Sequence, residues 1–191
     1  MVLSIAEITV ELREILLKDR PQALYDISKK GTVPVLQTEE QIIDESMDII
    51  YWALKKSNKY EDYFQSPLSQ EKIIFNNDSK FKIWLDRYKY NNRFEKYSIE
   101  ECKLKSDRIL SDYEKKLTIN EYLINNSIQV TDIAIFPFIR QFANVNIEYF
   151  SITYPNINRW LQNLINSNLF KSVMKKYSQW KISDTANIVI F

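Results

Sequence analysis

Two short segments of the sequence combine groups that can hold both charges of a small ligand. Gly31 to Leu36 carries a proline within a β-favouring run, and Glu45-Ser46 opens a helical pattern shortly after it. A helix N-terminus has unpaired N–H groups that, with the Ser46 hydroxyl, suit a carboxylate, whereas the Glu45 side chain suits an ammonium group. Taken singly, Ser46 is better explained as an ordinary helix cap and Glu45 as an ordinary first-turn acid. Their spacing after the proline segment favours a binding site built from a strand edge and a helix start.

The residue types that the chain lacks exclude several kinds of catalysis. It contains no histidine, which removes imidazole bases, His-dependent triads and nearly all zinc sites. Its single cysteine, Cys102, can form neither an intramolecular disulfide nor a Cys-x-x-Cys redox pair. Charges of both signs surround Cys102, which gives no reason for a lowered thiol pKa, so we predict a structural role for it. We predict no metal site and no catalytic residue within the chain.

Composition and charge indicate a soluble globular protein in the cytoplasm. The 191 residues, 45% hydrophobic and 27% charged, can bury a core. A formal net charge of +1 gives no electrostatic reason to bind nucleic acid or an anionic membrane. The longest apolar run, residues 133–139, is far shorter than the ~20 residues of a membrane span. Residues 1–12 lack the basic start of a signal peptide, and the single cysteine fits a reducing compartment.

Residue patterns predict an α/β region over residues 1–56. The elements predicted in chain order are a strand over 8–15, a helix over 22–28 after Pro21, strands over 32–36 and 41–44, and a helix over 46–54. Gly31, the only glycine, directly precedes the proline strand, so we expect a positive φ there.

Helical periodicity dominates the rest of the chain. Residues 57–70 are polar with Pro67 among them, which is typical of a linker. From residue 71 to 191 apolar residues recur at intervals of three and four, as in Phe81, Trp84, Leu85 and Tyr88, so this part is predicted to be an all-helical domain.

The succession of these two parts resembles the glutathione S-transferase superfamily, and most closely its bacterial, cysteine-type, omega-like members. The segments that carry the resemblance are Gly31-Thr-Val-Pro-Val-Leu36, Asp44-Glu-Ser46 and residues 131–141. It implies an incomplete thioredoxin-like N-terminal domain followed by an all-helical C-terminal domain. It also implies glutathione as a co-substrate, no metal, a small electrophilic or disulfide second substrate, and a homodimer as the assembly to expect.

The resemblance assigns glutathione-binding roles to five residues. Pro34 corresponds to a cis-proline of the family, and the Val33 backbone would pair with the cysteinyl part of glutathione. Glu45 and Ser46 would hold the γ-glutamyl end, and Arg20 would pair with the glycyl carboxylate.

Two aromatic residues of the helical part have two interpretations. The helical spacing of Trp84 and Tyr88 favours core packing first, and a pocket for the second substrate is the sharper family interpretation. Stacking of nucleic acid on the aromatic and basic residues of 81–97 is a distant third.

In this family a strand and a helix start with the catalytic Cys, Ser or Tyr precede the first matching segment. The sequence begins after them, so we expect an N-terminally truncated chain that is catalytically impaired. The alternatives are a non-catalytic binding or regulatory protein on the transferase fold, and a decayed remnant. Without the middle strand, we expect the strand over 8–15 to be orphaned or poorly paired. Gln129 replaces the usual Ser or Thr three residues before Asp132, so we expect a helix start weaker by about 1 kcal/mol.

Overall fold

The computed structural model describes residues 1–94 and 96–190, which form two compact units. One unit combines Met1–Tyr60 with the chain from Asn168 onward, and the other is Glu61–Ser167. The prediction of an α/β part followed by an all-helical part is confirmed. The end of the chain differs from the predicted boundaries, because the residues after 167 belong to the first unit. The predicted linker over 57–70 contains α4 (Tyr60–Tyr63).

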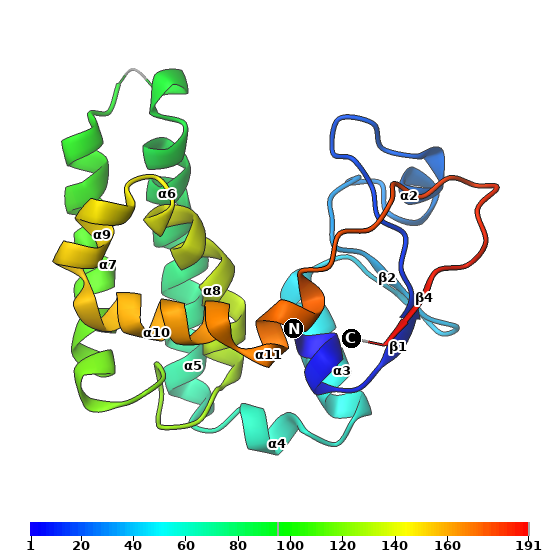
Figure 1. Cartoon of the computed structure of the whole chain (residues 1–191), viewed down its shortest axis with the longest axis horizontal. Coiled ribbons are helices and arrows are strands. Elements are labelled where there is room, and N and C mark those ends of the chain that lie inside the picture. The colour runs from blue at the N-terminus through cyan, green and yellow to red at the C-terminus, as the bar shows by residue number, and fades with distance from the viewer. Residues whose placement is uncertain (95, 191) are drawn as a thin grey trace. The chain divides into compact units, whose positions relative to one another are not determined.

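The N-terminal unit contains short strands and helices (Figure 1). Its elements are α1 (Val2–Ile5), β1 (Thr9–Glu11), α2 (Gln22–Ile27), β2 (Leu36–Gln37), β3 (Ile42–Ile43), α3 (Ser46–Lys56), α11 (Asn168–Val173) and β4 (Ile188–Ile190). The apolar face of α3 packs on α1, burying Ile50, Ala53 and Leu54. Pro21 stands directly before α2, as predicted, because its missing N–H costs nothing there.

The strand predicted over 8–15 is not orphaned, but its pairing is short. β1 is only three residues long and pairs antiparallel with β4, with Thr9 opposite Ile190 and Glu11 opposite Ile188. A further bond from Leu12 N to Asn187 O, at 2.8 Å, extends this pairing. Exposed strand edges leave polar backbone groups unpaired, and here the C-terminal segment supplies their partners. β2 and β3 form a separate antiparallel pair.

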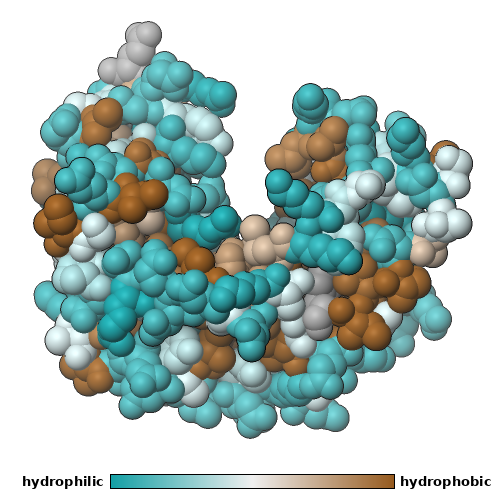
Figure 2. All heavy atoms as spheres, in the orientation of Figure 1, coloured by the Kyte–Doolittle hydropathy of each residue, from teal (hydrophilic) through white to brown (hydrophobic). Residues whose placement is uncertain are grey.

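The second unit is helical (Figure 1). Its elements are α5 (Pro67–Asn76), a π-helix η1 (Asn77–Phe81), α6 (Lys82–Lys89), a short 3₁₀ helix η2 (Asn91–Arg93), α7 (Ile99–Ile119), α8 (Val130–Ala143), α9 (Ile147–Thr153) and α10 (Pro155–Asn166). An aromatic cluster centred on Phe142 fills its core, with ring centroids 5.6 Å from Phe81 and 4.9 Å from Tyr88. No helix in the described part of the chain is long and apolar enough to cross a membrane. Hydrophilic residues cover most of the visible face of each unit (Figure 2).

The start of α8 is satisfied by side chains from elsewhere in the unit. Gln129, a poor N-cap by type, uses its side-chain oxygen to accept from the Gln65 N–H at 3.0 Å. The Thr131 N–H donates to Gln70 Oε1 at 3.0 Å, and the Gln129 N–H donates to Asp132 Oδ2 at 2.9 Å. The expectation of a weak helix start considered Gln129 alone. In the structure Gln70 takes over part of the capping role.

Candidate glutathione site

The segment that leads into β2 is shaped by a glycine turn and a proline. Gly31 has φ +59°, as predicted, and a Cβ there would overlap the ring of Tyr25, so both backbone and space favour glycine. The Val33–Pro34 peptide bond is cis, as the resemblance implied. The Val33 side chain is 47% exposed. Its main-chain N–H and C=O take part in none of the hydrogen bonds formed within the described residues, so this edge is open to an extended peptide.

The start of α3 lies ten residues after this segment and has open donors. Glu45 is the N-cap residue, and its carbonyl accepts the first helical bond, from Ile49 N, at 3.0 Å. No side chain caps the helix, so the N–H groups of Ser46 and the two residues after it have no acceptor within residues 1–94 and 96–190. Ser46 is exposed. Its hydroxyl and the free N–H groups form a suitable environment for a carboxylate.

Lys30 forms an ion pair with the carboxylate of Glu45. Its Nζ donates to Glu45 Oε1 at 2.6 Å and lies 3.5 Å from Asp44 Oδ2. The hydrogen bond to Glu45 is the main reason that the pKa of Lys30 is raised. Asp44 is also held by the Ser28 hydroxyl at 3.1 Å. A cation therefore already sits at the position that the prediction assigned to an ammonium group of the ligand.

Four of the predicted site residues belong to two segments of the N-terminal unit. Val33 and Pro34 lie in the loop that leads into β2, and Glu45 and Ser46 lie at the start of α3. Arg20 is exposed in the loop before α2 and makes no ion pair with another described residue.

The two predicted second-substrate residues lie on α6 of the helical unit. Tyr88 is 4% exposed and packs against Phe142, so core packing, the first interpretation, describes its position. Burial raises the pKa of its hydroxyl. Trp84 is partly exposed, with its ring 5.4 Å from that of Tyr97 and 4.4 Å from the Arg87 guanidinium.

Cys102 is buried within α7. Its side chain is 0% exposed, and burial, with a smaller contribution from the Glu101 carboxylate, raises the pKa of the thiol. The nearby Arg87 lowers this pKa, but by less. A protonated, inaccessible thiol is a poor nucleophile, in agreement with the structural role predicted for it. The described residues contain no group of His, Cys, Asp or Glu side chains arranged to hold a metal ion.

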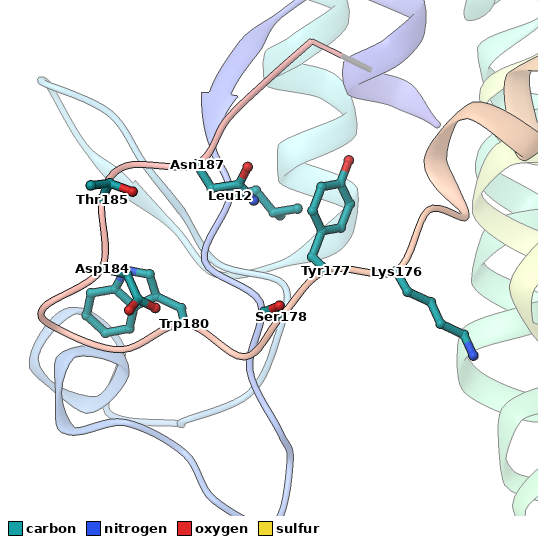
Figure 3. A pocket seen from close by; sticks show the side chains of 8 residues that line it. All are labelled: Leu12, Lys176, Tyr177, Ser178, Trp180, Asp184, Thr185 and Asn187. Atoms are coloured by element: carbon teal, nitrogen blue, oxygen red, sulfur yellow. The ribbon is translucent and has the colours of Figure 1, made fainter.

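A second concave region of the N-terminal unit lies under the C-terminal segment (Figure 3). This cavity of about 320 Å³ is lined by Leu12 and by residues from Lys176 to Asn187. Trp180 holds the segment in place by two contacts. Its main-chain N–H donates to Glu14 O at 2.7 Å, and its ring lies 4.8 Å from the Arg13 guanidinium. None of the five predicted glutathione-binding residues lines this cavity.

Comparison with known protein families matches both units. The glutathione S-transferase N-terminal domain matches residues 1–61, and the glutathione S-transferase C-terminal domain matches residues 53–168. This chain belongs to the glutathione S-transferase family. Glutathione is the substrate of this family, and the open edge at Val33 and the start of α3 both lie within the matched N-terminal domain. Comparison with curated protein sequences gives no significant match.

Solved structures of glutathione S-transferases share the fold. Glutathione S-transferase 1-6 from Anopheles dirus species B is 20% identical, with a TM-score of 0.71 over 85% of this chain and 80% of that one. BphK, a bacterial glutathione S-transferase solved as a ternary complex, is 16% identical, with a TM-score of 0.74 over 90% and 88%. Glutathione S-transferase I bound with lactoylglutathione is 18% identical, with a TM-score of 0.69 over 89% and 88%.

Two features of this glutathione S-transferase were missed from the sequence. The Lys30–Glu45 ion pair joins residues 15 positions apart, and no periodicity marks it. The C-terminal strand β4 had a detectable signal, because Ile188-Val189-Ile190 is a run of β-branched residues. The run does not indicate which strand pairs with it, so the pairing with β1 could not be predicted.

Proposed function

We propose that this protein binds glutathione in its N-terminal unit and uses it at most slowly as a co-substrate. The proposal rests on two open groups of the N-terminal unit, the main chain of Val33 and the uncapped start of α3 at Glu45 and Ser46. Both elements lie within the region that matches the family's N-terminal domain.

Each part of glutathione has a partner of matching chemistry. The N–H and C=O of Val33, held beside Pro34, pair with the cysteinyl main chain as an added strand would. The Ser46 hydroxyl and the free N–H groups of α3 bind the γ-glutamyl carboxylate, and Glu45 binds the γ-glutamyl ammonium. Arg20 pairs with the glycyl carboxylate.

The ammonium group of glutathione must either share the Glu45 carboxylate with Lys30 or displace Lys30 from it. The Lys30 and Glu45 side chains are 55% and 61% exposed, and exposed ion pairs contribute only ~0–1 kcal/mol. The exchange of one ammonium group for another at Glu45 therefore costs little. Lys30 can then pair with Asp44, which already lies within reach of it.

The proposed reaction is that of the family, attack of the glutathione thiolate on a small electrophile or reduction of a disulfide. We propose that turnover by this chain is weak, because its one thiol is the buried Cys102. The alternative is a non-catalytic binding or regulatory protein on the same fold. Trp84 and Tyr88 are retained as proposed second-substrate residues, with Trp84 the more accessible of the two. The proposed location is the cytoplasm and a homodimer the proposed assembly.

Isothermal titration of the full chain with glutathione tests the binding site. Ser46→Ala and Glu45→Gln should each weaken binding by about tenfold or more, because each removes a hydrogen bond to a charged group. Ser111→Ala and Glu39→Gln, at exposed positions away from the site, are matched controls and should leave affinity unchanged. Unchanged affinity in both site variants would remove this assignment.

Steady-state turnover with general electrophiles tests the second half of the proposal. We expect weak activity that Cys102→Ser leaves unchanged. Glutathione binding with negligible turnover supports the binding-protein alternative. Robust turnover that is lost on replacing Cys102 would show that the nucleophile has been misassigned.

A further inference from the structure

The helical unit contains a cavity with strongly basic walls. Its volume is about 520 Å³, and it lies between α5 with η1 on one side and α7 on the other. Lys72 and Lys80 line the first wall, and Arg108 and Lys116 line the second, against a single carboxylate from Asp112. None of the four cations forms an ion pair with another described residue. Unneutralised cations around a cavity of this size are an electrostatic environment for an anion.

Buried polar atoms without partners occur on the elements that form the walls of this cavity. Within the described chain they are Asn77 Oδ1, Ser106 Oγ and Tyr113 Oη, all from η1 or from α7, which packs against it. Tyr113 lines the cavity and is only 3% exposed. Burial, with smaller contributions from Asp112 and Asp78, raises the pKa of the Tyr113 hydroxyl, so it remains a neutral donor. Unsatisfied buried polar groups are uncommon, and π-helices are frequent at functional sites.

The order of the cations along the two walls indicates that they lie toward opposite ends of the cavity. In Figure 1 the chain runs up through α5 and α6 and back down through α7, so the two walls are antiparallel. From this antiparallel order we infer that Lys72 and Lys116 belong to one end of the cavity, and Lys80 and Arg108 to the other. Eight residues separate the members of each wall, which corresponds to about 12 Å along a helix. Asp112 lies midway between the α7 cations, where it disfavours negative charge.

We propose that this cavity, the basic groove, binds a small dianion with an anionic group at each end of an uncharged middle. The planar Arg108 fork and the lysines pair with the two anionic ends. The middle of the ligand contacts Ile73 and Ile109, which also line the groove. The volume lies within the range of roughly 300–1,000 Å³ typical of small-molecule sites. All residues of the groove belong to the helical unit, so this site is separate from Val33, Glu45 and Ser46.

Isothermal titration of the full chain with sebacate, a ten-carbon dicarboxylate, tests the spacing of the two ends. Sebacate should bind, and the short dicarboxylate succinate and the monocarboxylate decanoate should bind at least about tenfold more weakly, because each loses one charged contact. Similar affinity for all three compounds, or no binding of sebacate, would overturn the proposal.

Variants test the residues of the groove. Arg108→Met should weaken sebacate binding about tenfold or more, whereas Lys115→Met, an equal loss of charge on the exposed side of α7, should not. Asp112→Asn should strengthen binding severalfold, a gain that misfolding cannot imitate. If Arg108→Met and Lys115→Met lost the same amount of sebacate affinity, net charge alone would explain the binding, and the site would be rejected. A change of oligomeric state in Arg108→Met, without sebacate binding to the parent chain, would instead identify the groove as an interface between copies.

Discussion

Asp132, the buried carboxylate at the start of α8, should make the stability of the helical unit depend on pH. It is 0% exposed and accepts hydrogen bonds from Gln129 N and Leu123 N and from Trp160 Nε1, at 2.9, 3.0 and 2.9 Å. Burial outweighs these bonds and raises the pKa of Asp132 from 3.8 to about 6. Because the folded-state pKa is the higher one, the folded state holds the proton more tightly than the unfolded state does.

The stabilisation from this protonation is complete below pH 3.8 and is lost as the pH rises through about 6. The full difference between the two pKa values corresponds to about 3 kcal/mol. Between pH 4.5 and pH 7 the loss amounts to about 2 kcal/mol of the free energy of unfolding. Asp132→Asn is neutral throughout and lacks this loss, although its amide leaves the Gln129 N–H without an acceptor, at about 1–3 kcal/mol.

Urea unfolding followed by circular dichroism and tryptophan fluorescence, at pH 4.5 and pH 7, measures the effect. The advantage of the parent chain over Asp132→Asn should shrink by about 2 kcal/mol between the two pH values. Asp132→Ala should be less stable than Asp132→Asn at both, because Leu123 N and Trp160 Nε1 also lose their acceptor. Asp86→Asn, on the exposed surface of α6, is a control and should change stability by less than about 0.5 kcal/mol. A parent-to-Asn difference that is the same at both pH values would refute the reasoning.

Three further outcomes follow from the N-terminal unit. Lys30→Met should raise glutathione affinity by up to about fivefold in isothermal titration, because it frees Glu45 of a competing cation; weaker binding would mean that Lys30 contacts the ligand. Truncation after Lys176 should lower the melting temperature and increase light scattering, since it exposes the paired edge of β1; an unchanged melting temperature would contradict a stabilising role for β4. Gly31→Ala should lower the free energy of unfolding in urea by at least about 1 kcal/mol, because of its positive φ and the overlap with the Tyr25 ring. Adding Tyr25→Ala to this variant should remove only the part of the loss that comes from the overlap.

Much of the local structure could be predicted from the sequence because it depends on neighbouring residues. The proline ring favours the helix start after Pro21, and the positive φ of Gly31 follows from the missing Cβ. Helical spacing of apolar residues predicted α3 and α6, since a repeat of 3.6 residues places them on one buried face. The two segments of the proposed glutathione site were also recognisable, because their chemistry resides in a short segment around a proline and in a helix start, although the strand predicted over 32–36 is limited to β2.

Contacts between residues far apart in the chain were decided by the tertiary structure alone. β1 pairs with β4 at the other end of the chain, where each satisfies the backbone groups of the other, and no local pattern names that partner. Gln70 reaches 61 positions along the chain to the start of α8, so Gln129 does not have to act alone as the cap. The sequence by itself determined which groups could bind charge and where helices begin. Only the folded chain decided that Lys30 pairs with Glu45, and that four cations line one cavity together with Tyr113, because distance in space sets electrostatic and hydrogen-bond partners.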